Sequence, residues 1–111
     1  MKSLYEYLNE SFKWMEKDST TMHDLLGVLI DTNINTGIIK YCPAMKNFVN
    51  FMDDNEKSLL NTLYDKFSNT GKIQLTKDEK NLVQRIAVFA YKNAHTLNAD
   101  ISNLYHNALN L

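Results

Sequence analysis

The chain ends in its most regular segment, residues 77–111, which reads KDEKNLVQRIAVFAYKNAHTLNADISNLYHNALNL. Small and apolar residues recur there every seven positions, a spacing typical of coiled-coil helices that pack along one continuous seam. One seam position holds Ala87, Ala94, Ile101 and Ala108, and the other holds Val83, Ala90, Leu97, Leu104 and Leu111. Because nothing interrupts this register, we expect a single helix from Lys77 to near Asn110.

Such a helix would be about 50 Å long at 1.5 Å per residue, which exceeds the width of a globule of this size. Its end should therefore protrude or meet a partner, and a homodimer through this helix is one expected arrangement. Ala90, Leu97, Ile101 and Leu104 would then form the partner-binding face, although the same residues equally suit packing on this chain's own helices. A second interpretation remains open, in which Asn98 caps a separate final helix.

The N-terminal segment predicts an amphipathic helix over residues 4–17. Ser3 and Glu6 have the spacing of a capping box, in which each side chain accepts a hydrogen bond from the other residue's backbone N–H. The apolar arc covers about half of the helix circumference, because Tyr7 and Trp14 widen it on one side. These two aromatic residues face either the core of this chain or a protein partner.

The next segment predicts a buried central helix, capped by Ser19, Thr20 or Thr21 and followed by a turn at residues 33–37. Its apolar side chains point in nearly every direction, so neighbouring helices should surround it. Gly27 lies in its interior and costs about 1 kcal/mol relative to alanine. We expect another helix to cross closely at this point.

Residues 38–41 are largely apolar and predict either a short strand or an irregular buried segment. Over residues 43–68 the apolar side chains return to one helical stripe. Two interpretations are open: one helix runs from residue 43 to about residue 68, or the helix breaks at the polar residues 53–55 and restarts with an aspartate cap. We favour a break or kink at these residues. Thr76 and Glu79 form a further capping box, which marks the start of the last segment.

Together these segments predict an all-α fold, a four- to five-helix antiparallel bundle with a long C-terminal helix in a heptad pattern. Only three glycines and one proline occur in 111 residues, which agrees with a mostly helical chain. Residues 43–68 should lie antiparallel to the C-terminal helix. A chain of this length is expected to form one domain, residues 1–111.

Charge and cysteine content indicate which binding partners and which cellular compartment to expect. The chain has 12 basic and 13 acidic side chains and a net charge of -1, so clustered positive charge for nucleic acid or an anionic membrane is not expected. The longest unbroken apolar run is far too short to cross a bilayer. Cys42 is the single cysteine, which excludes an intrachain disulfide and favours a reducing compartment. The excess of asparagine and lysine suggests an AT-rich genome, so we expect the cytoplasm of a bacterial host cell.

No residue pattern predicts catalysis, a cofactor or a metal site, and we expect no enzyme. His23, His95 and His106 include no pair spaced three or four residues apart, the spacing that brings two ligands together on one helix. Residues 66–77 have the outline of a calcium loop, but Lys66 and Lys77 stand where carboxylates must bind. The three glycines are scattered and form no phosphate-binding loop.

These exclusions favour a small helical protein–protein interaction module that acts by occlusion or scaffolding. In length and composition the chain resembles phage-encoded inhibitors of host proteins, including anti-defence proteins, and this resemblance implies an inhibitor. It is also similar in length and expected architecture to bacteriocin immunity proteins, which are cytoplasmic helical bundles and give an alternative function. A weak nucleic-acid-binding accessory protein is a third interpretation.

Overall fold

The computed structural model describes residues 12–33, 36–69 and 71–111. These residues form four α-helices, two 3-10 helices and one two-stranded antiparallel sheet. In chain order the elements are β1 (Phe12–Trp14), α2 (Glu16–Ile30), η1 (Gly37–Lys40), η2 (Pro43–Phe51), α3 (Asp54–Phe67), β2 (Gly71–Ile73), α4 (Lys77–Asn93) and α5 (Ala99–Ala108). The expectation of a predominantly α-helical fold is therefore confirmed.

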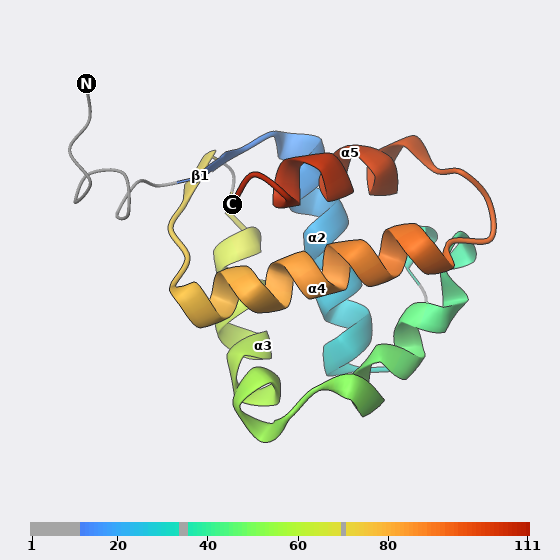
Figure 1. Cartoon of the computed structure of the whole chain (residues 1–111), viewed down its shortest axis with the longest axis horizontal. Helices are drawn as coiled ribbons and strands as arrows, with labels where there is room; N and C mark the ends of the chain where they lie inside the picture. The colour runs from blue at the N-terminus through green and yellow to red at the C-terminus, as the bar shows by residue number, and fades with distance from the viewer. Residues whose placement is uncertain (1–11, 34–35, 70) are drawn as a thin grey trace.

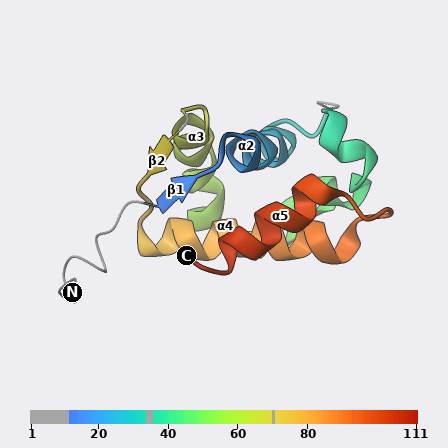
Figure 2. The ribbon, with the colours of Figure 1, turned by 90° about the horizontal axis from the view of Figure 1, so that it is seen from above.

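The helices lie in two layers (Figure 1). Figure 2 shows α2 and α3 beside each other in one layer, with α4 and α5 in the other. Helix α2 contacts α3, α5 and both 3-10 helices, while η2 also packs on α4. Helix α3 runs antiparallel to α2, and α4 passes across α2. The sequence had predicted that residues 43–68 lie antiparallel to one long C-terminal helix, and the structure does not show this arrangement.

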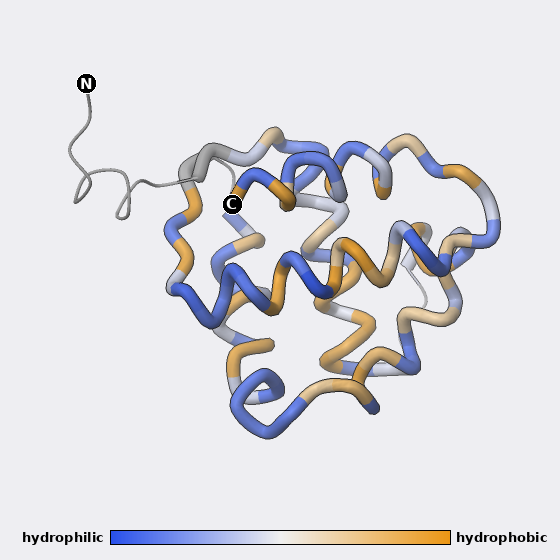
Figure 3. The backbone as a smooth tube through the Cα atoms, viewed as in Figure 1, coloured by the Kyte–Doolittle hydropathy of each residue, from blue (hydrophilic) through white to orange (hydrophobic). Residues whose placement is uncertain are grey.

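The core is centred on α2, which is apolar on almost every side. Hydrophobic residues dominate the part of α2 that lies behind α4, whereas the turn before α3 is hydrophilic (Figure 3). The largest fully buried side chains of α2 are Met22, Leu25, Leu26 and Val28. This agrees with the predicted central helix, which needs neighbours on several sides to cover its apolar surface.

The prediction of one continuous C-terminal helix is wrong, and the alternative with a cap at Asn98 is confirmed. Helix α4 ends at Asn93, and α5 begins after a connection formed by residues 94–98. The Asn98 side chain accepts a hydrogen bond of 3.0 Å from the backbone N–H of Ile101. In the connection, the N–H of His95 donates to the carbonyl oxygen of Tyr41 at 2.7 Å, which ties the turn to the end of η1.

The chain turns back at residues 94–98 because most apolar residues of the heptad seam can then be buried against other segments of the same molecule. Helix α5 returns along α4, and both contact the opposite layer or its connecting segments. The seam residues of the two helices are buried between these elements: Val83, Ala87, Ala90, Ile101, Leu104 and Ala108. Folding back covers more apolar surface than a protruding helix would cover in a single chain.

The predicted N-terminal helix over residues 4–17 is wrong for residues 12–15, residues 16 and 17 belong to the start of α2, and residues 4–11 lie outside the described part. Residues 12–14 form β1, which pairs antiparallel with β2 so that Trp14 lies opposite Gly71. The Trp14 side chain is buried and packs edge-on against Phe67, with ring centroids 4.9 Å apart. Pairing with a distant segment has overridden the local helical pattern.

Helix α2 begins at Glu16, earlier than predicted, because the expected cap residues use their hydroxyl groups differently. Ser19 donates to the carbonyl oxygen of Phe67 at 3.1 Å and so joins α2 to the end of α3. The hydroxyl of Thr21 donates to the carbonyl oxygen of Lys17 at 2.9 Å, one turn earlier in the same helix. These residues therefore lie inside the helix instead of starting it.

The predicted break at residues 53–55 and both helix starts are confirmed. Asp53 accepts from the N–H of Glu56 at 2.8 Å, and Glu56 accepts from the N–H of Asp53 at 3.1 Å. Thr76 and Glu79 form the same reciprocal pair at the start of α4. Residues 38–41, for which a strand or an irregular segment was expected, instead belong largely to a 3-10 helix.

Candidate functional site

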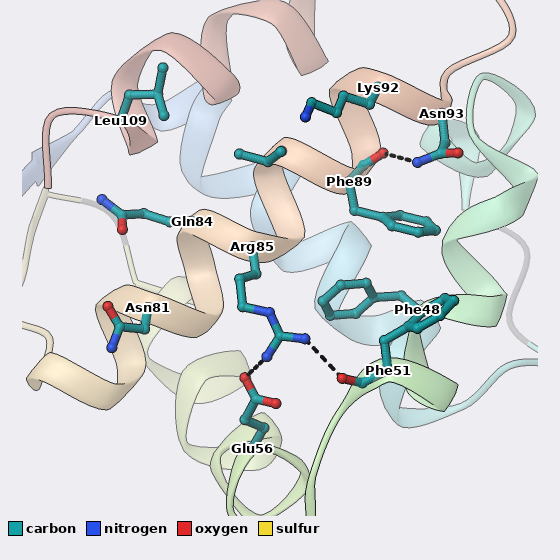
Figure 4. Close-up of a pocket in the computed structure, with 11 residues that line it drawn as sticks. Phe48, Phe51, Glu56, Asn81, Gln84, Arg85, Phe89, Lys92, Asn93 and Leu109 are labelled. Atoms are coloured by element: carbon teal, nitrogen blue, oxygen red, sulfur yellow. Dashed lines mark hydrogen bonds and ion pairs between the residues drawn. The ribbon is translucent and has the colours of Figure 1, made fainter.

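An open groove of about 850 Å³ runs along the outer face of α4 (Figure 4). One wall comes from η2 and the start of α3, and the other comes from the end of α5. The lining residues are Phe48, Phe51, Glu56, Asn81, Gln84, Arg85, Val88, Phe89, Lys92, Asn93 and Leu109. The groove is thus built by segments that are distant in the sequence.

Three phenylalanine rings form one side of the groove. A 3-10 helix has three residues per turn, so Phe48 and Phe51 lie above one another on the same face of η2. Both contact Phe89 of α4, with ring centroids 5.1 and 6.1 Å from its own. Phe48 is buried, whereas 62% of Phe51 is exposed. The cluster therefore extends from the core to the surface.

Arg85, the single arginine of the chain, holds this wall against α4. Its guanidinium forms an ion pair with the carboxylate of Glu56 and donates to the carbonyl oxygen of Phe51 at 2.8 Å. The guanidinium carbon also lies 5.5 Å from the centre of the Phe48 ring, within the range of a cation–π contact. Arg85 thereby satisfies the carbonyl at the end of η2, and its charge is already neutralised.

The remaining polar side chains divide into engaged and free groups. Gln84 donates to the carbonyl oxygen of Ala108 at 3.1 Å, and Asn93 donates to that of Phe89 at 2.9 Å. Lys92 is exposed and has no ion pair with any other residue that the structure describes. The lining therefore carries one uncompensated positive charge beside a largely apolar surface.

The opposite wall ends at Leu109, of which 50% is exposed. Leu109 and the aromatic wall lie on opposite sides of α4 (Figure 4), and Val88 of α4 also lines the groove. A large aliphatic side chain and a large aromatic side chain thus remain in contact with water on two sides of one concave surface. Because these side chains border a concave surface, another molecule that enters it can cover both of them.

The partner-binding residues predicted from the sequence occupy other places. Tyr7 lies outside the described residues. Trp14 is buried against Phe67, and three further predicted contacts are buried between the helices: Ala90, Ile101 and Leu104. Among the five predicted residues that the structure describes, Leu97 alone is exposed, by 83%, in the connection between α4 and α5. These five residues therefore do not form a common surface.

The sequence did not predict the groove, because its surface forms only when segments that are distant in the sequence pack together. The stripe of residues 43–68 omits Phe51, and the heptad seam of the last segment omits Val88 and Phe89. Apolar residues that fall outside an otherwise regular apolar stripe were the available signal. These residues identify positions that are not fully buried, but they do not reveal that these positions line one groove.

The described residues do not form a cluster of three or more histidine, cysteine or acidic side chains that could hold a metal ion. The ring of His23 stacks on Tyr64, with centroids 4.0 Å apart. Cys42 is buried, and this burial raises the pKa of its thiol despite the hydrogen bond from the backbone of Met45. What the groove offers is contact surface, one free cation and a few amides.

Comparison with family models, with curated proteins and with solved structures finds no match for this chain. Within the described residues, none of the helices is both long and apolar enough to cross a bilayer.

Proposed function

We propose that the protein is a small helical binding module that attaches to another protein through the groove on α4. The observation that carries this proposal is the pair of exposed apolar walls, Phe51 and Leu109, on either side of one concave surface. Burial of such side chains yields about 25 cal/mol per Å² of apolar area removed from water. The binding module would act by occlusion or scaffolding, without a covalent step.

An inhibitor of a bacterial host protein is the specific form of this function that agrees with the length and composition of the chain. An inhibitor of this kind needs a concave contact surface and a stable core. The groove on α4 could provide the first and the buried apolar residues the second. We place it in the bacterial cytoplasm, because the single thiol, Cys42, is suited to a reducing compartment.

Site-specific photo-crosslinking tests the proposal. Phe51 is replaced by p-benzoylphenylalanine, which keeps an aromatic ring at the groove, and the protein is irradiated in a lysate of a low-GC bacterium. The matched control carries the same group at Leu97, which is also exposed but lies outside the groove. A protein adduct from position 51 and none from position 97 is the expected result. Equal adducts from both positions, or none from position 51, would contradict the groove as the binding site.

A further inference from the structure

The groove also indicates the kind of partner segment that fits it, an inference that rests on the proposed function. We propose that its occupant is an amphipathic α-helix of a partner protein, which places apolar residues between Phe51 and Leu109 and a carboxylate beside Lys92. Three features of the lining carry this inference: its shape, its hydrogen-bonding groups and its charge.

The shape of the groove suits a helix. Its floor is the outer face of α4, where Arg85, Val88 and Lys92 recur at helical spacing. Side chains in such rows form ridges that pack into the grooves of a second helix. A helix about 10 Å wide would fill the observed volume over about two turns. Residues at positions i, i+3, i+4 and i+7 of the partner would therefore meet Val88 and the two walls.

The hydrogen-bonding groups argue against an extended segment. Arg85 is engaged by Glu56 and by the carbonyl of Phe51, and Gln84 and Asn93 each use one amide N–H within this chain. The amide groups that remain, including that of Asn81, are separate side chains and do not form the continuous row of backbone donors and acceptors that a strand edge offers. None of the residues described as lining the groove belongs to β1 or β2, so the described lining includes no strand edge. A buried backbone needs hydrogen-bond partners. An α-helix supplies its own, whereas an extended segment would leave most of its backbone groups without a partner in the groove.

The charge of the lining selects an acidic partner helix. The ion pair between Arg85 and Glu56 is internally neutral, so Lys92 contributes the uncompensated charge. A carboxylate placed beside Lys92 would be attracted, and a basic side chain would be repelled. Charge complementarity of this kind chiefly gives specificity, while the apolar walls provide most of the affinity.

Selection from a randomised library of 16-residue peptides displayed on phage tests this inference on the full chain. Clones are counter-selected on the double variant Phe51→Ser with Leu109→Ser, so that only groove-dependent peptides remain. The expected survivors have apolar residues at helical spacing and an excess of aspartate and glutamate. Synthetic copies should become helical on binding, as measured by circular dichroism.

Charge reversal then tests the role of Lys92. Lys92→Glu should weaken binding of the selected peptides about tenfold, which corresponds to about 1.4 kcal/mol. The matched control is Lys57→Glu, an exposed position on α3 outside the groove, which should change affinity less than twofold. Circular dichroism of both variants verifies that they are folded.

Several outcomes would overturn the inference. Proline-rich, extended or basic survivors would contradict an acidic helix, as would equal effects of Lys92→Glu and Lys57→Glu. Tighter binding of dodecanoate than of any peptide would assign the groove to a small carboxylate. These results differ from a failure of the proposed function, in which Phe51 would crosslink to no protein. A crosslinked protein whose attached segment is not an acidic helix would refute the inference alone.

Discussion

Glu79 accepts hydrogen bonds from two groups that belong to different parts of the chain, although only 2% of its side chain is exposed. Its carboxylate accepts one hydrogen bond from the ammonium group of Lys66 in α3 at 2.7 Å and another from the backbone N–H of Thr76 at 2.8 Å. Burial by itself raises the pKa of Glu79, but the bonds from Lys66 and Thr76 outweigh it, so the pKa lies below its usual value. The ionised carboxylate therefore stabilises both the start of α4 and its packing on α3.

Glu79→Gln should lower the free energy of unfolding by about 1–2 kcal/mol at pH 7. The amide oxygen can still accept from Thr76, so the change removes mainly the charge that pairs with Lys66. A carboxyl with a lowered folded-state pKa contributes stability above its unfolded pKa, and this contribution is lost as the pH falls through the folded pKa. The difference between the wild-type protein and the variant should therefore shrink in acid, as measured by urea unfolding at pH 7 and pH 3.

Asp78→Asn is the control for this measurement, because Asp78 lies in the same helical turn but is exposed. It should change the unfolding free energy by no more than about 0.5 kcal/mol. Equal stability of Glu79→Gln and wild type at pH 7 would show that the buried pair contributes nothing net. The capping role of Glu79 was predictable from its spacing to Thr76, but its partner Lys66 was not, because the two meet only in the fold.

At the scale of single elements, Gly27 is a buried glycine in the interior of α2. The sequence predicted a close helix crossing there, and the structure places the side chain of Tyr64 at this position instead. A Cβ atom added at Gly27 would lie 3.5 Å from Cε2 of Tyr64, an ordinary van der Waals distance. Gly27→Ala should therefore stabilise the protein by about 0.5–1 kcal/mol through the higher helix propensity of alanine.

Thermal unfolding of Gly27→Ala checks this expectation. Gly37→Ala serves as the comparison, since nothing lies within 4 Å of a Cβ atom there and Gly37 begins a 3-10 helix rather than lying within an α-helix. A lower melting temperature for Gly27→Ala would mean that α2 and α3 need the closer approach that only glycine permits.

In the helical hairpin of α4 and α5, Leu97 and Leu104 occupy the same heptad position but differ in burial. Leu97 is exposed in the connection, whereas Leu104 is fully buried. Leu97→Asp should alter the unfolding free energy by less than about 0.5 kcal/mol. Leu104→Asp should unfold the protein, because it places a carboxylate in the apolar core. Circular dichroism on heating distinguishes these outcomes, and unfolding by Leu97→Asp would contradict the observed break between the helices.

Element boundaries were predictable where a short local signal defines them. The predicted aspartate cap within residues 53–55 and the predicted capping box of Thr76 and Glu79 both mark observed helix starts. The break between Asn93 and Asn98 had weak local signals inside a continuous heptad pattern. Its cause is the contact of α5 with α4 and α2, which depends on distant residues and overrides the local pattern.

At the scale of the whole molecule, the internal seam predicts the oligomeric state of the isolated protein. The alanine-rich surface that suggested a homodimer is covered by this chain's own helices, with Ala87, Ala90 and Ala108 all buried. Two copies can no longer pair through it without unfolding the hairpin. We therefore expect a monomer at micromolar concentrations, measured by light scattering over a concentration series.

The groove on α4 is a second surface through which two copies could associate, and variants separate it from the C-terminal segment. A dimer that dissociates in the Phe51→Ser variant would place a second copy in the groove and would contradict a dedicated partner helix. A dimer that persists in that variant but is lost in Leu97→Asp would restore the C-terminal segment as an interface. A monomer in all three proteins leaves Phe51 and Leu109 free to bind another protein, which is the condition that the proposed function requires.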